Sequence, residues 1–149
     1  MTMQKKAIFF IVMLGICSLV NAQCDKKLKV KTEKVYQVNA DNTEGDEIPV
    51  TAVITLSKDS IFVLMNWTDG NVADLKGRHT QTVCKMNKSY SEGTVEYKTD
   101  ATLTTHGEAK ASKMLFTIES KAGRIKLYGV PEDDKDKICF VIKEKEEIK

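Results

Sequence analysis

The chain has 149 residues, with 23 lysines or arginines against 21 aspartates or glutamates, a formal net charge of +2 at pH 7. This length fits one ordinary domain. The nearly balanced charge argues against nucleic acid or an anionic membrane as the main partner, because both require a clear basic excess or patch.

The N-terminal stretch has the layout of a secretory signal peptide. Two lysines precede the apolar run Ala7–Val20, and cleavage is expected after Ala22. At about 1.5 Å per helical residue the run reaches only about 21 Å, short of the ~30 Å hydrocarbon core, which makes a retained anchor the weaker alternative. We therefore predict a signal peptide over residues 1–22 and a single secreted or periplasmic domain, without a membrane span, over residues 23–149.

Three cysteines remain after this cleavage, Cys24, Cys84 and Cys139. Two are expected to pair in an oxidising compartment, leaving one thiol free or able to link two molecules. The sequence allows three different bridges. We favour Cys84–Cys139, because both lie in strand-like runs while Cys24 lies near the new terminus. Acylation is disfavoured, because neither Cys17 nor Cys24 follows a small residue.

The first half of the domain contains three strand signals. Leu28–Val38 alternates apolar and charged residues, and the alternation slips near Glu33–Val35, which indicates a bulge. Asn39–Glu47 is polar and predicts a loop. Val50–Leu56 and Ile61–Met65 then form the most apolar part of the domain, and the turn formers between them predict an antiparallel hairpin at the centre of the core.

The second half continues in short alternating runs. Residues 71–78 are expected to be irregular, and residues 143–149 to be solvated and frayed. The predicted strands are Thr80–Met86, Thr94–Thr105, Lys113–Glu119, Arg124–Tyr128 and Lys137–Ile142.

Apolar residues do not recur at helical spacing over three turns anywhere in the domain. Seven or eight short strands with turns about every 8–12 residues predict an all-β fold, an antiparallel up-and-down meander closed as a small barrel or a lipocalin-like half-barrel. A two-sheet sandwich is the alternative. The similarity to lipocalins is one of architecture only, because their glycine-x-tryptophan opening is absent.

Catalytic signatures are absent from the sequence, which has two histidines, His79 and His106, and no paired-histidine, nucleophile-elbow or phosphate-loop motif. His79 stands five residues before Cys84, so a Cys–His nucleophile is conceivable, although a bridged or buried cysteine is expected instead. The acidic stretches Asp41–Glu47 and Glu132–Asp136 do not follow the EF-hand order and are expected to be solvated turns. We predict no enzyme activity, no cofactor and no bound metal.

Four aromatic residues are candidates for lining an apolar pocket, the alternative being ordinary core packing. They are Trp67, Tyr97, Phe116 and Tyr128. The first hypothesis is a non-enzymatic domain that binds a small apolar ligand or a partner protein. The second is a cell-envelope module that pairs with its partner through an exposed sheet edge. The third, a small hydrolase with scattered catalytic residues, is the weakest of the three.

Overall fold

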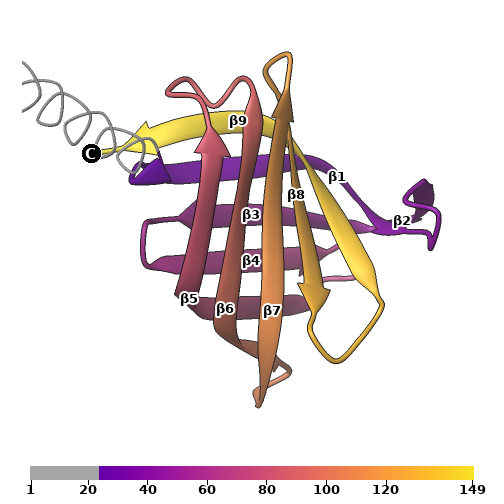
Figure 1. Ribbon diagram of the computed structural model, residues 1–149. Helices are drawn as coiled ribbons and strands as arrows, with labels where there is room; N and C mark the ends of the chain where they lie inside the picture. Colours follow the sequence, from indigo (N-terminus) through magenta and orange to yellow (C-terminus); the bar gives the residue numbers. More distant parts are fainter. Residues whose placement is uncertain (1–23) are drawn as a thin grey trace, which may run out of the picture.

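The computed structural model describes residues 24–149, which form nine strands and no α-helix (Figure 1). The predicted signal peptide, residues 1–22, lies outside the described residues. Across residues 24–149, no helix is long and apolar enough to cross a membrane. The strands are β1 (Lys27–Val38), β2 (Glu44–Ile48), β3 (Val50–Leu56), β4 (Ser60–Trp67), β5 (Val72–Met86), β6 (Gly93–Thr105), β7 (Glu108–Lys121), β8 (Arg124–Pro131) and β9 (Lys137–Ile148).

Eight of these strands close into an antiparallel barrel. Neighbours in the sheet follow the order β2-β1-β3-β4-β5-β6-β7-β8-β9, and an additional pairing of β1 with β9 joins the two sides. That pairing runs from Lys27 opposite Ile148 to Val38 opposite Lys137. The up-and-down barrel predicted from the alternating runs is confirmed, and the two-sheet sandwich is excluded.

Strand β2 lies outside the closed barrel as a continuation of β3. The first half of β1 pairs with β3, from Leu28 opposite Leu56, and its second half pairs with β2, from Val35 opposite Ile48. Pro49 separates β2 from β3, and β2 projects to the right in Figure 1. The loop predicted over Asn39–Glu47 is therefore shorter than expected, because the far end of β1 offers a free edge to which even a charged segment pairs.

The central hairpin predicted around Val50–Leu56 and Ile61–Met65 is present and occupies the core. Its strands pair from Val50 opposite Trp67 to Leu56 opposite Ile61. Ile54 and Ile61 are almost completely buried. The Ser57 amide donates to the Ser60 carbonyl across the turn, at 2.9 Å.

Two strands are longer than the sequence predicts. Of residues 71–78, expected to be irregular, all but the first belong to β5, which places Ala73 and Leu75 in the core. Residues 143–148, expected to be frayed, extend β9 because their side chains complement those of β1. One such ion pair joins Lys31 to Glu144 at 3.3 Å. The predicted irregularity of β1 is confirmed by register shifts between Lys31 and Lys34.

The disulfide joins Cys24 to Cys84, with the two Cα atoms 6.1 Å apart, so the predicted Cys84–Cys139 pairing is wrong. Strand β5 extends beyond its last pair with β4, Ser60 opposite Arg78. The bridge ties the segment before β1 to this extension. Cys139 packs in a separate cluster with Tyr36 and Val141, where it is a free and completely buried thiol.

Candidate functional site

A cavity of about 490 Å³ occupies one end of the barrel interior. We call this the open end; it is bounded by the β4–β5 turn (residues 68–71), the β6–β7 turn (residues 106–107) and the β8–β9 loop (residues 132–136). Ligand pockets in proteins commonly measure about 300 to 1,000 Å³. The cavity therefore has the volume to hold a small molecule.

Small side chains at inward positions leave this space. Ala73 on β5, Ala101 on β6, Ser112 on β7 and Gly129 on β8 all line the cavity. Ala101 lies directly opposite Ser112 in the sheet, so that neither side chain fills the gap left by the other. A run of larger aliphatic residues at these positions would close the cavity.

The deep wall of the cavity is apolar. Phe116 and Phe140 are buried there, together with Val63 of the central hairpin. Phe116 lies so close to Gly129 that a Cβ atom at position 129 would sit 3.0 Å from the ring carbon Cε1. The glycine thus allows the phenyl ring to lie flat against β8 and form the floor.

Flexible and aromatic side chains surround the middle of the cavity. Met65 and Trp67 come from β4, Leu103 from β6, Met114 from β7 and Ile138 from β9. All five are partly exposed and pack against the main core. Methionine adapts its shape readily to different apolar surfaces, so these walls are suited to following the outline of a ligand.

The mouth of the cavity is polar and charged. Lys110 of β7 lines it together with Asp133, Asp134 and Asp136 of the β8–β9 loop. Within the loop, the Lys135 amide donates to the side-chain Oδ1 of Asp134 at 2.6 Å. The Glu132 amide also donates to the Lys113 carbonyl of β7, at 2.8 Å.

The opposite end of the barrel, which we call the closed end, is filled. The β5–β6 loop (residues 87–92) folds over it and buries Tyr90, whose carbonyl accepts a hydrogen bond from the Ser120 hydroxyl at 2.6 Å. The Ala122 amide at the β7–β8 turn donates to Glu92 Oε1, also at 2.6 Å. Beneath Tyr90 the remaining void is only about 10 Å³, too small for a ligand.

The structure separates the four aromatic residues predicted to line a pocket. Trp67 and Phe116 line the cavity. Tyr97 is buried in the core instead, stacked on His79 with 4.2 Å between ring centroids. Tyr128 lies on the outer face, beside Cys139 and opposite it in the sheet. Strand alternation contained the signal for Tyr128, because the apolar residues Ile125 and Leu127 of the same strand are buried and Tyr128 alternates with them.

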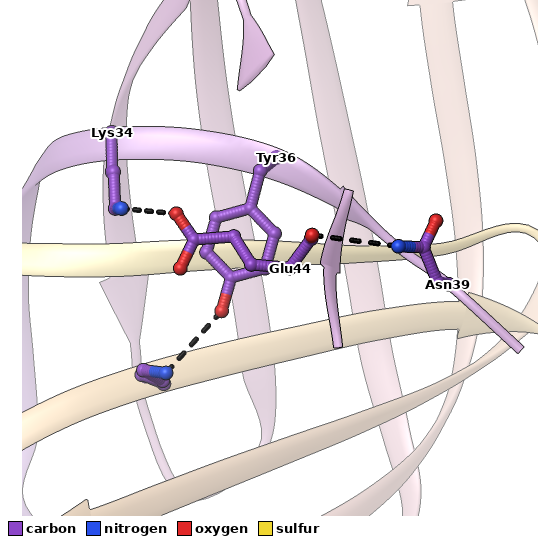
Figure 2. Close-up of polar contacts among 5 residues, drawn as sticks. Lys34, Tyr36, Asn39 and Glu44 are labelled. Atoms are coloured by element: carbon purple, nitrogen blue, oxygen red, sulfur yellow. Dashed lines mark hydrogen bonds and ion pairs between the residues drawn. The ribbon is translucent and has the colours of Figure 1, made fainter. Parts of the chain in front are cut away.

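An outer cluster, Tyr36, Tyr128, Cys139 and Val141, packs together residues of β1, β8 and β9. Figure 2 shows Lys34 of β1 in contact with Glu44 of β2, and the Tyr36 hydroxyl accepts a hydrogen bond from Lys126 at 3.3 Å. Burial raises the pKa of the Tyr36 hydroxyl and that of the Cys139 thiol above their ordinary values. Both groups therefore stay protonated at neutral pH, and the thiol is a packing group rather than a nucleophile.

The two histidines occupy unrelated environments. His79 Nδ1 hydrogen-bonds with Thr99 Oγ1 at 2.8 Å, and burial lowers the pKa of the ring. The Cys–His nucleophile considered for His79 and Cys84 is excluded, because the Cys84 sulfur is bonded to Cys24. His106 lies in the exposed β6–β7 turn, with Nε2 3.0 Å from Asn71 Oδ1. Among residues 24–149, no three histidine, cysteine or acidic side chains converge as metal ligands.

The chain matches no protein-family model, no curated protein and no solved structure. Its fold and cavity define it by class, as a closed eight-stranded antiparallel barrel with one additional strand and a hollow end.

Proposed function

We propose that this protein is a secreted or periplasmic, non-enzymatic barrel that binds a small apolar molecule in the cavity at the open end. The observation that carries the proposal is the cavity itself, about 490 Å³ in volume with a floor of Phe116, Phe140 and Val63. Transfer of apolar surface from water into such a space is favourable by about 25 cal/mol per Å². A ligand that fills it needs few polar contacts for useful affinity.

Export is supported by two independent features. The N-terminus has a signal-peptide pattern, and the Cys24–Cys84 disulfide is of a kind that persists in oxidising compartments. Both agree with a carrier that works outside the cytoplasm.

A protein-binding module that uses a sheet edge is the second candidate, because β2 has one edge outside the closed barrel. The edge is short, Glu44–Ile48, and three of its five residues are acidic. Short, charged edge strands are a common means of preventing strand addition. We therefore favour the cavity over the edge as the binding site.

The only tryptophan in the sequence, Trp67, lines the cavity and provides a reporter. The test titrates the purified protein with N-phenyl-1-naphthylamine, a neutral apolar probe that fluoresces when it leaves water. Binding is expected to increase probe emission and to quench Trp67 through energy transfer. Native mass spectrometry of protein isolated from its own secretion route would detect a natural ligand as extra mass that is lost on denaturation.

A matched pair of variants distinguishes the cavity from the surface. Ser112→Phe puts a ring into the cavity, whereas Ala111→Phe puts the same ring on the exposed side of the same strand. Ser112→Phe is expected to weaken probe binding by about tenfold or more and to leave the melting temperature equal or higher. Equal affinities in both variants would locate the probe outside the cavity and contradict the proposal.

A further inference from the structure

We infer that the ligand of the open-end cavity is an amphiphile with a cationic head group, whose apolar tail lies in the barrel and whose charge stays at the mouth. The inference rests on the proposed function. It adds the charge of the ligand and the direction in which it enters. Two features carry it, the change of polarity along the cavity and the sign of the charges around its mouth.

Polarity changes in one direction along the cavity. Phe116 lies at the deep end, opposite Gly129, and its side chain is 2 % exposed. Farther along the same face of β7 come Met114 and Ser112, which are partly buried, and then Lys110, which is exposed. A molecule with one apolar and one polar end therefore fits the cavity in only one orientation, with its polar end outward.

Carboxylates dominate the charge around the mouth. Asp133, Asp134 and Asp136 line it, against a single lining lysine, Lys110. None of the ion pairs among residues 24–149 involves Asp133 or Asp136, so their charge is not offset by a bound side chain. A cationic group at the mouth would thus meet a net negative surface. A carboxylate there would be attracted by Lys110 alone.

The connecting segments at the open end are also more acidic than those at the closed end. At the open end, residues 68–71, 106–107 and 132–136 contain five acidic side chains and one lysine. At the closed end, residues 57–59, 87–92 and 122–123 contain two acidic side chains and two lysines. A cleft lined by charges of one sign focuses the field and concentrates ions of the opposite sign. The negative charge is therefore concentrated at the end that has the cavity.

The test compares amphiphiles that share a twelve-carbon chain and differ only in head group. Dodecylammonium, dodecanol and dodecanoate, each below its micelle concentration, compete for the bound naphthylamine probe at low ionic strength and pH 7.5. We expect dodecylammonium to bind about tenfold tighter than dodecanoate, with dodecanol between them. At about 1 M salt, where the screening length falls to about 3 Å, this preference should nearly vanish.

Variants identify the carboxylates responsible. Asp133→Asn with Asp136→Asn should reduce the preference for dodecylammonium to about twofold and leave dodecanol affinity unchanged. The control, Asp25→Asn with Asp59→Asn, makes the same change of net charge beside the disulfide and should leave the preference intact. Lys110→Met should weaken dodecanoate binding further.

The outcomes distinguish failure of the cationic head group from failure of the proposed apolar carrier. Dodecanoate binding as tightly as dodecylammonium, or a preference that survives the loss of Asp133 and Asp136, would overturn the cationic head group while the apolar carrier stands. Failure of the probe and all three amphiphiles to bind would overturn the carrier and this inference together.

Discussion

The two ends of the barrel are built from the same strands but differ in almost every physical respect. At the closed end, Tyr90 and the large aliphatic residues beneath it leave a void of about 10 Å³. At the open end, alanine, serine and glycine at equivalent inward positions leave about 490 Å³. The closed end is also fixed by the Cys24–Cys84 bridge and by the 87–92 loop.

Under the proposed function, this difference would let a small barrel combine stability with binding. Dense packing and the covalent link are concentrated at the closed end, and the open end is packed less tightly. The closed end should account for most of the free energy of unfolding, and the open end for ligand affinity. The predictions below compare the same kind of change at the two ends, except for the disulfide, which has no counterpart at the open end.

The largest difference should come from truncating aliphatic side chains. Ile118→Ala, in the closed end, should reduce the free energy of unfolding by about 2 to 5 kcal/mol, because it leaves a sealed cavity. Leu103→Ala should cost about 1 kcal/mol or less, because Leu103 already borders open space. Urea unfolding followed by circular dichroism measures both. Equal losses would show that the open end is packed as tightly as the closed end.

Removal of the disulfide should rank next. Cys24 and Cys84 are 60 residues apart in sequence, and a closed loop of that length stabilises by up to about 4 kcal/mol through the entropy of the unfolded chain. The double variant Cys24→Ser/Cys84→Ser should lose about 2 to 4 kcal/mol and become insensitive to reductant. Cys139→Ala serves as the control and should still be destabilised by dithiothreitol. A reductant-insensitive Cys139→Ala variant would contradict the pairing.

Two inward glycines provide a smaller contrast. A Cβ at Gly77 would lie 2.5 Å from Thr99 Cγ2 and 2.9 Å from Ile61 Cγ2, inside closely packed core. Gly77→Ala should therefore destabilise by about 1 to 3 kcal/mol. Gly129→Ala should cost less than about 1 kcal/mol, because the Phe116 ring has the cavity to move into, and it should weaken probe binding instead. Thermal melts of both variants measure the loss of stability, and probe titrations measure the loss of affinity.

The last contrast is in stability at high pH. Burial in the closed end raises the pKa of Tyr90 to about 12, from about 10 when unfolded. Above pH 10 the unfolded chain loses a proton that the folded chain keeps, so stability falls by at most about 1.4 kcal/mol per pH unit from this residue. Tyr90→Phe should make the fall between pH 10 and 12 shallower. Trp67→Phe, at the open end, should leave its slope unchanged, and an identical slope in Tyr90→Phe would contradict the assignment.

Strand alternation predicted most of the fold from the sequence, and it failed where neighbouring strands decide the structure. The hairpin around Ile54 and Ile61 could be recognised because both of its strands alternate clearly. Residues 72–78 could not be recognised as a strand, because they contain Gly77. This glycine is required by the close approach of Thr99, which belongs to another strand. Residues 143–148 are almost entirely charged, and only their pairing with β1 makes them a strand.

The site was partly predictable for a similar reason. Trp67 and Phe116 lie on strands with strong alternation, and both line the cavity. The rim residue Lys110 gave no signal, and the acidic stretch that contains Asp133 was interpreted as a solvated turn, because charges at strand ends are ordinary in solvent. The disulfide was missed because sequence spacing does not reveal which strands meet at a corner of the barrel.

The joining of β1 to β9 has a consequence for how the molecule forms. The pair Lys27–Ile148 brings together the two ends of the described chain, so the barrel cannot close until β9 has been synthesised. Contacts between residues so far apart in sequence form slowly, because the chain loses much entropy before they are made. Until β9 has paired with β1, both edges of any sheet formed by β1 to β8 stay exposed. The Cys24–Cys84 bridge lies entirely within the first part of the chain and is able to form during that interval.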